Sequence, residues 1–156
     1  MPQLQQPKIT PFLWFDADAE AAAEMYTAIF DNSRILDVSR AGGKVMSVTF
    51  EVSGQRLMAL NGGPHYELSP AFSLFVSVET QEELDRTWDA LLAGGGKPTR
   101  CGWLVDRYGL SWQVIPTALM RLMGDPDPGR AGRTVKAMMG MIKLDIAELE
   151  RAAASG

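Results

Sequence analysis

The chain has little cysteine and no long apolar segment. Cys101 is the only cysteine among 156 residues, which excludes a disulfide bond within the chain. No apolar run approaches the roughly 18 to 20 residues that a helix needs to cross a bilayer. The segment from Met1 to Gln6 lacks the basic and apolar regions of a secretory signal. We therefore expect a cytoplasmic protein without a membrane partner.

Basic residues are also scarce relative to acidic ones. Lysine and arginine total 15 against 19 aspartates and glutamates, so the formal net charge is -4. Proteins that bind nucleic acid usually present a basic face to the phosphates. The charges here are interspersed, so we expect no nucleic-acid partner. The length suffices for one domain with a substantial core and is too short for two large ones.

The first half of the chain carries strand and helix signals in the order βαβββ. Residues 9–15 form an apolar, aromatic run of strand length, and the alanine-rich segment 20–30 has apolar residues at helical spacing. The carboxylates of Asp16 and Asp18 precede this helix as candidate N-caps. Turns with glycine then separate three short strands, which we place at residues 34–39, 45–52 and 56–60.

The second half repeats this order. It has a strand at residues 72–78, a helix at 81–92, a triple-glycine stop at 94–96, and three strands that lead to Ile115. Two βαβββ modules, each with a helix on the outer face of its sheet, leave the other sheet faces free to enclose a cavity. The predicted fold class is therefore α+β, with paired βαβββ modules and a concave sheet in residues 1–116.

Residues 117–156 have the character of a helical C-terminal extension of the same domain. Asp127 and Pro128 offer an N-cap and a first-turn proline, and Asp145 with Glu148 resembles a capping box. We therefore expect two helices here. A stripe at the spacing of one helix face is expected to pack on the domain or on a second subunit, and it consists of Val135, Met138, Met139 and Ile142.

Several stretches resemble one known family. They are Ile9 to Asp16, Ala19-Glu20 leading to Met25-Tyr26, Leu60-Asn-Gly-Gly-Pro64, Cys101-Gly-Trp103, Asp106 to Val114 and, in the tail, Ala137 to Ala152. In these the chain resembles the vicinal oxygen chelate superfamily, which includes glyoxalase I, bleomycin-resistance proteins and extradiol dioxygenases. Within it the chain is similar to the PhnB-like group, often labelled 3-demethylubiquinone-9 3-methyltransferase. The resemblance implies the paired βαβββ fold and a homodimer.

The methyltransferase label can be tested on the residues. A methyltransferase that uses S-adenosylmethionine usually has a glycine-rich turn after its first strand, where the backbone approaches the cofactor. Here Phe15 is followed by Asp-Ala-Asp-Ala-Glu, without a glycine. The run of glycines at 94–96 follows a helix and precedes a strand, the reverse of the order in a nucleotide-binding βα turn. We therefore do not expect this activity.

The resemblance also places the positions where a metal would bind. Metal-dependent members of the superfamily take His, Glu or Gln ligands from the first, fourth, fifth and eighth strands. The matching windows here hold Thr10 to Phe12, Leu60-Asn61, Phe72-Ser73 and Gln113, the last where a glutamate is common. Neutral amides and hydroxyls bind Ni, Zn or Fe weakly. We therefore expect no metal and no other cofactor.

Two residues are candidates for catalysis. His65, the only histidine, follows a Gly-Pro turn and could act as a general acid or base, since histidine changes charge near neutral pH. Cys101 has Arg100 and Arg107 near it in the sequence, and positive charge favours a reactive thiolate. Each has a structural alternative. His65 could be a solvated loop residue, and Cys101 could be buried as a small apolar side chain.

The residues predicted to bind a ligand are aromatic and neutral polar. If Gln113 points into the cavity, Ser111 and Ile115 should line the same wall, because side chains alternate between the faces of a strand. Aromatic walls with a few amides suit a planar organic molecule, although core packing explains the aromatics equally well. The predicted ligand-binding set is Trp14, Asn61, Ser73, Trp103, Ser111 and Gln113.

Three functions are compatible with these residues. The first is binding of a small organic molecule in a metal-free pocket, which would sequester or sense that molecule. The second is catalysis, either by a metal-assisted lyase or isomerase or by a metal-free enzyme that uses His65 or Cys101. The third is a dimeric scaffold with a vestigial pocket. Binding predicts graded losses over several substituted wall residues, whereas catalysis predicts a sharp loss at one.

Overall fold

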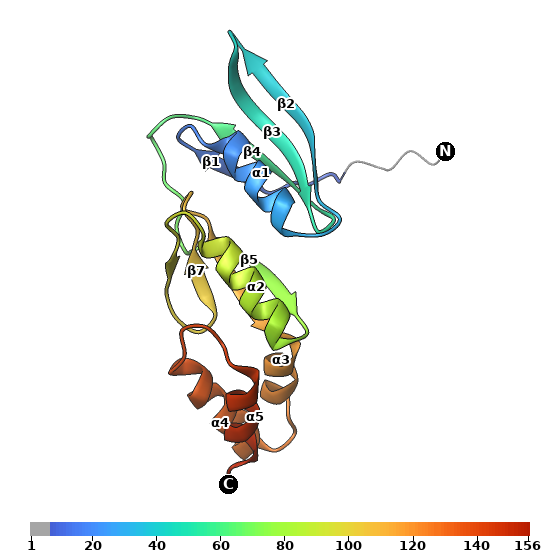
Figure 1. Cartoon of the computed structure of the whole chain (residues 1–156), viewed down its shortest axis with the longest axis vertical. Helices are drawn as coiled ribbons and strands as arrows, with labels where there is room; N and C mark the ends of the chain where they lie inside the picture. Colours follow the sequence, from blue (N-terminus) through green and yellow to red (C-terminus); the bar gives the residue numbers. More distant parts are fainter. Residues whose placement is uncertain (1–6) are drawn as a thin grey trace, which may run out of the picture. The chain divides into compact units, whose positions relative to one another are not determined.

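The computed structural model describes residues 7–156, which contain eight strands and five helices (Figure 1). The strands are β1 (Phe12–Phe15), β2 (Arg34–Ala41), β3 (Lys44–Val52), β4 (Gln55–Asn61), β5 (Ser73–Val78), β6 (Lys97–Pro98), β7 (Trp103–Val105) and β8 (Ser111–Pro116). The helices are α1 (Ala19–Ile29), α2 (Gln81–Leu92), α3 (Thr117–Met123), α4 (Pro128–Met139) and α5 (Ile146–Ala154). None of the helices in residues 7–156 has the length and apolarity that a membrane-spanning segment needs.

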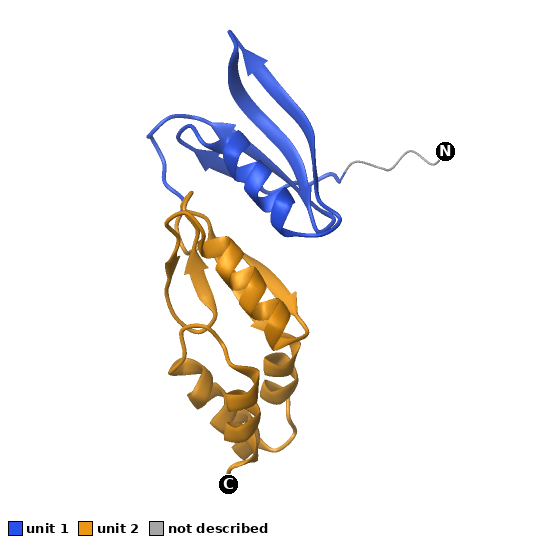
Figure 2. Cartoon of the chain, viewed as in Figure 1, with its two compact units in different colours: residues 1–68 blue, residues 69–156 orange. Residues whose placement is uncertain are grey.

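The chain divides into two compact units, Met1–Leu68 and Ser69–Gly156 (Figure 2). The first unit holds one βαβββ module, and the second holds the other module together with α3, α4 and α5. This arrangement confirms the predicted α+β class with two modules and a helical tail. The tail belongs to the second unit, and the grouping of residues 1–116 as one domain stays a prediction.

The first unit is a four-stranded sheet with α1 against one face. Its strands run in the order β1-β4-β3-β2, and the β1–β4 pair is parallel. Because side chains alternate between faces along a strand, Leu13, Val48 and Leu57 share one face, and all three are buried. The Tyr26 ring of α1 lies 6.3 Å from the Phe50 ring of β3. This apolar layer between α1 and the sheet is the core of the unit.

The second unit repeats this arrangement with α2. Its strand order is β5-β8-β7-β6, with β5 and β8 parallel. Leu84 and Leu91 of α2 are fully buried, and Trp88 is 5% exposed. Leu104 and Trp112 are register partners on β7 and β8, and both are buried on the face of the sheet that α2 contacts through β5 and β8. One face of this sheet is therefore a core, and the alternate residues occupy the face without a helix.

The start of α1 differs from the prediction. Asp18 holds the N-cap position, but its side chain makes no capping hydrogen bond. The capping oxygen comes from Asn61 at the end of β4, whose Oδ1 accepts a hydrogen bond from the Ala19 N–H at 2.8 Å. The Asn61 Nδ2 donates to the Val45 carbonyl at 3.2 Å. Capping by Asp16 and Asp18 was therefore a wrong prediction, because parallel pairing of β1 with β4 brings a distant amide to the helix start.

One buried carboxylate organises the turn before β8. Asp106 is 3% exposed, and its Oδ1 accepts hydrogen bonds from the N–H groups of Tyr108 at 2.8 Å and Leu110 at 3.1 Å. Its Oδ2 accepts one from the Trp112 indole N–H at 2.8 Å. Gly109 has φ of +91°, a conformation that glycine adopts without steric cost. The stretch from Asp106 to Val114 thus begins with a turn that is held by its own carboxylate and that fixes the entry into β8.

The tail forms three helices instead of the predicted two. The predicted caps of α4 and α5 are confirmed, since the Asp127 side chain accepts from the Gly129 N–H at 3.0 Å and Asp145 from the Glu148 N–H at 3.0 Å. The additional helix α3 continues directly from β8, and its N-cap residue is Pro116, which makes no side-chain cap. It was missed because no capping residue marks its start.

The predicted apolar stripe of the tail is not a packed face throughout. α4 ends at Met139 with Gly140 as its C-cap, so Ile142 falls outside the helix. Met139 is 60% exposed and Ile142 is 55% exposed, whereas Thr134 is fully buried. Met139 and Ile142 are therefore not buried within the chain, although the Met139 sulfur lies 3.9 Å from the Cys101 sulfur. Their contact with a second subunit stays a prediction.

One glutamine joins the tail to α2. Gln81 donates from Nε2 to the Asp85 carboxylate at 2.9 Å and to the Leu144 carbonyl at 3.1 Å, and its Oε1 accepts from the Ile146 N–H at 2.8 Å. Lys143 adds an ion pair with Asp85 at 3.0 Å. Leu144 is fully buried at this junction. These contacts attach the start of α5 to the first turn of α2.

Acid should weaken this attachment. The hydrogen bond from Gln81, followed by the contact with Lys143, lowers the pKa of Asp85 below its ordinary value of 3.8. Its charged form therefore stabilises the folded state above pH 3.8, and this contribution disappears as the pH falls through the lower, folded-state pKa. We expect Asp85→Asn to cost less than about 1 kcal/mol at neutral pH, because the Lys143–Asp85 pair is exposed.

Urea unfolding of the wild type and Asp85→Asn from pH 6 to pH 2 measures this contribution. The difference in unfolding free energy should close as the medium becomes more acidic than pH 3.8. Asp89→Asn is the matched control, because Asp89 is an exposed residue of the same helix, and surface changes of this kind alter stability by about 0.5 kcal/mol or less. A difference for Asp85→Asn that stays constant with pH would contradict the assignment.

Candidate functional site

The open face of the second sheet holds most of the predicted ligand-binding residues. Ser73 pairs with Ser111, and Phe75 with Gln113, in the β5–β8 register, while Trp103 pairs with Gln113 in the β7–β8 register. Register partners point to the same face. The face opposite α2 therefore carries Ser73, Phe75, Trp103, Ser111, Gln113 and Ile115. As the alternation predicted, Ser111 and Ile115 share a face with Gln113.

The polar groups of this face form a small cluster that is incompletely bonded. Gln113 Nε2 donates to the Ser73 hydroxyl at 3.0 Å, which fixes the amide in one orientation. Among the described residues, the Ser111 hydroxyl is buried without a hydrogen-bond partner. A buried polar group left unpaired costs about 1–3 kcal/mol. The cluster therefore has unused hydrogen-bonding capacity beside an amide that is already oriented.

Aromatic side chains flank this cluster. Phe75 is 50% exposed, which is unusual for a phenylalanine in the middle of a strand, and Trp103 is half-buried. Trp112 lies on the other face, where it is 1% exposed and bonded to Asp106. The available aromatic surface on this sheet is thus that of Phe75 and Trp103. Such a surface can pack on a planar organic group.

The electrostatic character of this face is close to neutral. The residues that β5, β7 and β8 place on it are serine, phenylalanine, tryptophan, valine, glutamine and isoleucine. Lys97 on the edge strand β6 shares this face through its pairing with Val105 and is exposed. A site of this kind offers hydrogen bonds and apolar contact, with one cation at its margin.

Trp14 lies on the open face of the first sheet and is held in place by the glycine motif after β4. Its indole N–H donates to the Gly63 carbonyl at 2.9 Å, and its ring meets Tyr66 edge-to-face at 5.0 Å between centroids. A Cβ on Gly62 would lie 2.2 Å from the Trp14 ring. The predicted ligand-binding residue Trp14 therefore has a defined position, set by glycine at 62.

Asn61 is on the opposite face of its sheet from Trp14. Its amide caps α1 and bonds the β3 backbone, so the structure gives it a structural role. It also lines a shallow hollow of about 640 Å³ beside the start of α1, with Asp16, Glu20 and Lys44 among the other lining residues. Contact between Asn61 and a ligand stays a prediction, in surroundings different from those of Gln113.

Neither of the two candidate catalytic residues, His65 and Cys101, forms a hydrogen bond or ion pair with an acidic or basic side chain of the described residues. His65 is exposed in the loop after β4, and no hydrogen bond or ion pair joins it to another described residue. Cys101 is half-buried in a left-handed turn with φ of +54°, and its Sγ lies 3.9 Å from the Met139 Sδ. Its N–H donates to the Met141 carbonyl at 2.8 Å. The Cys-Gly-Trp motif thus contacts the segment that follows α4. Catalysis by His65 or Cys101 stays a prediction.

One charged cluster on the open face of the first sheet was missed in the sequence. Glu51 and Arg56 are register partners across the β3–β4 hairpin, and their side chains form an ion pair at 3.3 Å. Arg34 joins Glu51 at 3.6 Å. The Arg56 Nε is buried without a hydrogen-bond partner among the described residues. Counting outward from the Ser53-Gly54 turn would have paired Glu51 with Arg56.

The described residues contain no group of three or more His, Cys, Asp and Glu side chains that could hold a metal ion. On the open face of the second sheet, the donors available to a metal are the Gln113 amide and the hydroxyls of three serines, Ser73, Ser77 and Ser111. Such neutral oxygen donors suit a hard cation better than Zn, Ni or Fe, and they bind weakly without carboxylates. The absence of a native metal stays a prediction.

Comparisons with known proteins place this geometry in a family. The model of the 3-demethylubiquinone-9 3-methyltransferase family matches residues 7–115. A solved structure described as a putative 3-demethylubiquinone-9 3-methyltransferase, PhnB protein, from Bacillus cereus is 35% identical, with 70% of this chain and 99% of that chain covered and a TM-score of 0.66. A protein from Pseudomonas aeruginosa is 21% identical, with 71% and 98% covered and a TM-score of 0.59. A search of curated proteins found no match.

Proposed function

The chain belongs to the 3-demethylubiquinone-9 3-methyltransferase family, the PhnB-like group of the vicinal oxygen chelate superfamily, and from this premise we propose that it binds a small organic molecule on the open face of the β5–β8 sheet. One observation carries the proposal. The Gln113 amide is oriented by Ser73 beside the unpartnered, buried hydroxyl of Ser111. A ligand would meet the half-buried Gln113 amide first, and the bonds among Gln113, Ser73 and Ser111 can then rearrange to satisfy the Ser111 hydroxyl.

The chemistry of the face indicates the class of ligand. Phe75 and Trp103 offer aromatic surface, and the amide and hydroxyl groups offer neutral donors and acceptors. An uncharged planar molecule with one or two polar substituents would match both. A charged ligand would lose hydration without gaining an ionic partner on β5, β7 or β8, which costs affinity.

The family name describes methyl transfer to a quinone precursor, and the geometry supports binding better than that reaction. The β1–α1 connection has no glycine-rich turn. At the start of α1, the Ala19 N–H already donates a hydrogen bond to the Asn61 side chain. In a nucleotide-type cofactor site the helix N-terminus would instead face the cofactor. We therefore propose that the chain binds an aromatic molecule, and we do not propose that it transfers a methyl group. A homodimer and a cytoplasmic location stay predictions.

Side-chain amide resonances provide a direct test of the proposal. With catechol, phenol and indole as first probes, we expect a saturable shift of the Gln113 side-chain NH₂ signal in nitrogen–proton NMR spectra. Gln113→Ala should weaken binding about tenfold, since a hydrogen bond contributes about 0.5–1.5 kcal/mol and a lost partner leaves Ser73 unpaired as well. Gln55→Ala is the matched control, because Gln55 is an exposed residue of the other unit.

Two results would contradict the proposal. One is the absence of any saturable shift at Gln113 with all three probes. The other is equal affinity in the wild type and Gln113→Ala. A parallel titration with Zn²⁺, Ni²⁺ and Fe²⁺ tests the metal alternative, because near-stoichiometric metal that is lost in Gln113→Ala would favour a metal-assisted enzyme.

A further inference from the structure

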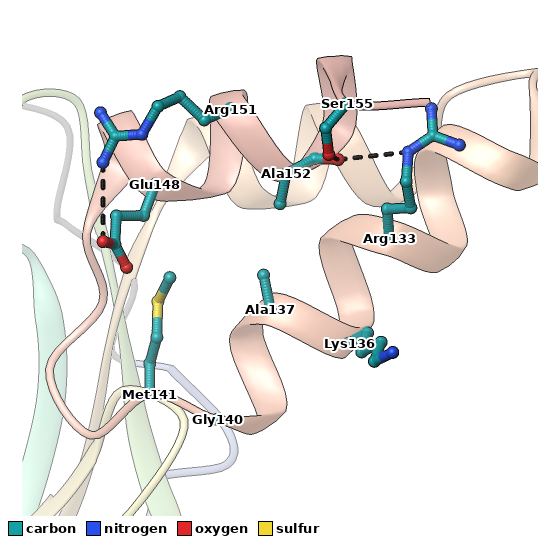
Figure 3. A pocket seen from close by; sticks show the side chains of 9 residues that line it. All are labelled: Arg133, Lys136, Ala137, Gly140, Met141, Glu148, Arg151, Ala152 and Ser155. Carbon is teal, nitrogen blue, oxygen red and sulfur yellow. Dashed lines mark hydrogen bonds and ion pairs between the residues drawn. The ribbon is translucent and has the colours of Figure 1, made fainter.

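The helical tail contains a hollow apart from the sheet faces. It lies between α4 and α5, has a volume of about 630 Å³ and is lined by residues from Arg133 to Ser155 (Figure 3). Sites for small molecules commonly span about 300–1,000 Å³. We call this hollow the tail groove. It lies beyond residues 7–115, which match the family model, so the family match assigns it no role.

Small side chains leave the middle of the tail groove open. In Figure 3, Ala137 of α4 and Ala152 of α5 lie across from each other, and Gly140 adds no side chain. Longer side chains stand at the two ends, with Arg133 at one end and Arg151 at the other. The space is therefore elongated and has a guanidinium group at each end.

The lining of the tail groove is positively charged. It includes Arg133, Lys136 and Arg151, and Glu148 is its one anionic residue. The chain as a whole has a formal net charge of -4. A local excess of cations on an acidic protein raises the local concentration of small anions. The tail groove therefore favours an anionic occupant.

Arg133 is the fixed element of this site. Its Nε donates to the Ala152 carbonyl at 3.2 Å and its Nη2 to the Ala153 carbonyl at 2.8 Å, at the C-terminal end of α5. These bonds hold the guanidinium plane, and the Nη1 amino group forms no hydrogen bond with a described residue. A donor that is already oriented loses little entropy when it binds an anion.

The other two cations can change partners at little cost. Arg151 pairs with Glu148 at 3.6 Å, and the two side chains are 68% and 59% exposed. Such exposed pairs contribute little, about 0.2–1 kcal/mol. Lys136 is exposed and has no ion pair with a described residue. Both side chains are therefore available to a ligand.

We propose that the tail groove binds a small organic molecule that carries at least two anionic groups, carboxylate or phosphate. Arg133 on α4 receives one group and Arg151 on α5 receives the other, while the exposed Lys136 of α4 adds positive charge to the lining. Guanidinium groups bind both kinds of oxyanion through paired N–H donors. This site is independent of the β5–β8 face, so Gln113→Ala should leave it unchanged.

Calorimetric titration of the full chain with citrate and with pyrophosphate, at constant ionic strength, tests the proposal. We expect saturable binding of one molecule per chain, and about tenfold weaker binding in the double variant Lys136→Gln/Arg151→Gln. Arg133 stays intact, because its replacement would also loosen α5. The control Arg86→Gln/Arg130→Gln removes the same charge from exposed residues outside the lining and should bind like the wild type.

The titrations distinguish carboxylate from phosphate ligands, and they also define the results that would overturn the proposal. Tighter binding of citrate assigns the site to carboxylates, and tighter binding of pyrophosphate assigns it to phosphates. No saturable binding of either probe at millimolar concentration would overturn the proposal. Equal affinity in the wild type and the groove double variant, or an equal loss in the control double variant, would also overturn it, because the binding would then reflect net charge alone.

Discussion

Replacing Asp106 with alanine should lower the free energy of unfolding by about 3–5 kcal/mol, the largest effect that we expect from one substitution. The carboxylate is 3% exposed and accepts three hydrogen bonds, from the N–H groups of Tyr108 and Leu110 and from the Trp112 indole. Each buried donor left without a partner costs about 1–3 kcal/mol, and water entering the space recovers part of this. Chemical denaturation measures the change.

Two further substitutions test whether the loss of stability comes from the hydrogen bonds of the Asp106 carboxylate. Asp106→Asn keeps one acceptor oxygen but turns an NH₂ group toward donors, so we expect a loss of about half that of alanine. Asp89→Ala removes an exposed carboxylate from α2 and should change stability by about 0.5 kcal/mol or less. If Asp106→Ala proved as mild as Asp89→Ala, the carboxylate would not organise the turn. The Gln113 NMR signal reports on the same variants, because the turn leads into β8.

Local signals in the sequence predicted those parts of the fold that depend on neighbouring residues. The caps of α4 and α5 were confirmed because Asp127 and Asp145 bond to groups two or three residues ahead. The cap of α1 was predicted wrongly because its acceptor is Asn61, 42 residues away. Only the pairing of β1 with β4 brings that side chain to the helix. Sequence spacing carries no information on such a contact.

In the candidate site, too, features that depend on neighbouring residues were predicted and contacts between distant residues were not. Alternation along β8 was enough to place Ser111 and Ile115 on the face of Gln113 and Trp112 on the other. The hydrogen bond between Gln113 and Ser73 spans 40 residues and depends on the parallel register of β5 and β8, which the sequence leaves open. The tail groove could not be predicted either, because it depends on how α4 packs on α5.

Replacing Gly62 with alanine should destabilise the first unit by about 1–3 kcal/mol, the range for overpacked sites. A Cβ at this position would lie 2.2 Å from the Trp14 ring, so the indole must move. It would then lose the hydrogen bond to the Gly63 carbonyl and the edge-to-face contact with Tyr66. Gly132→Ala is the control, since Gly132 lies inside α4 with no atom near its Cβ position, and it should stabilise by about 0.5–1 kcal/mol.

A double-mutant cycle shows whether the cost arises at Trp14. In a Trp14→Ala background the Gly62→Ala substitution meets no indole, so its cost should fall to within about 0.5 kcal/mol of zero. An equal cost in both backgrounds would place the strain in the backbone instead. The Trp14 indole is held by its hydrogen bond to the Gly63 carbonyl. Coupling between positions 14 and 62 would therefore show that the Leu60–Pro64 motif orients this ring. A glycine there then determines where an aromatic surface is presented, and not merely how the chain turns.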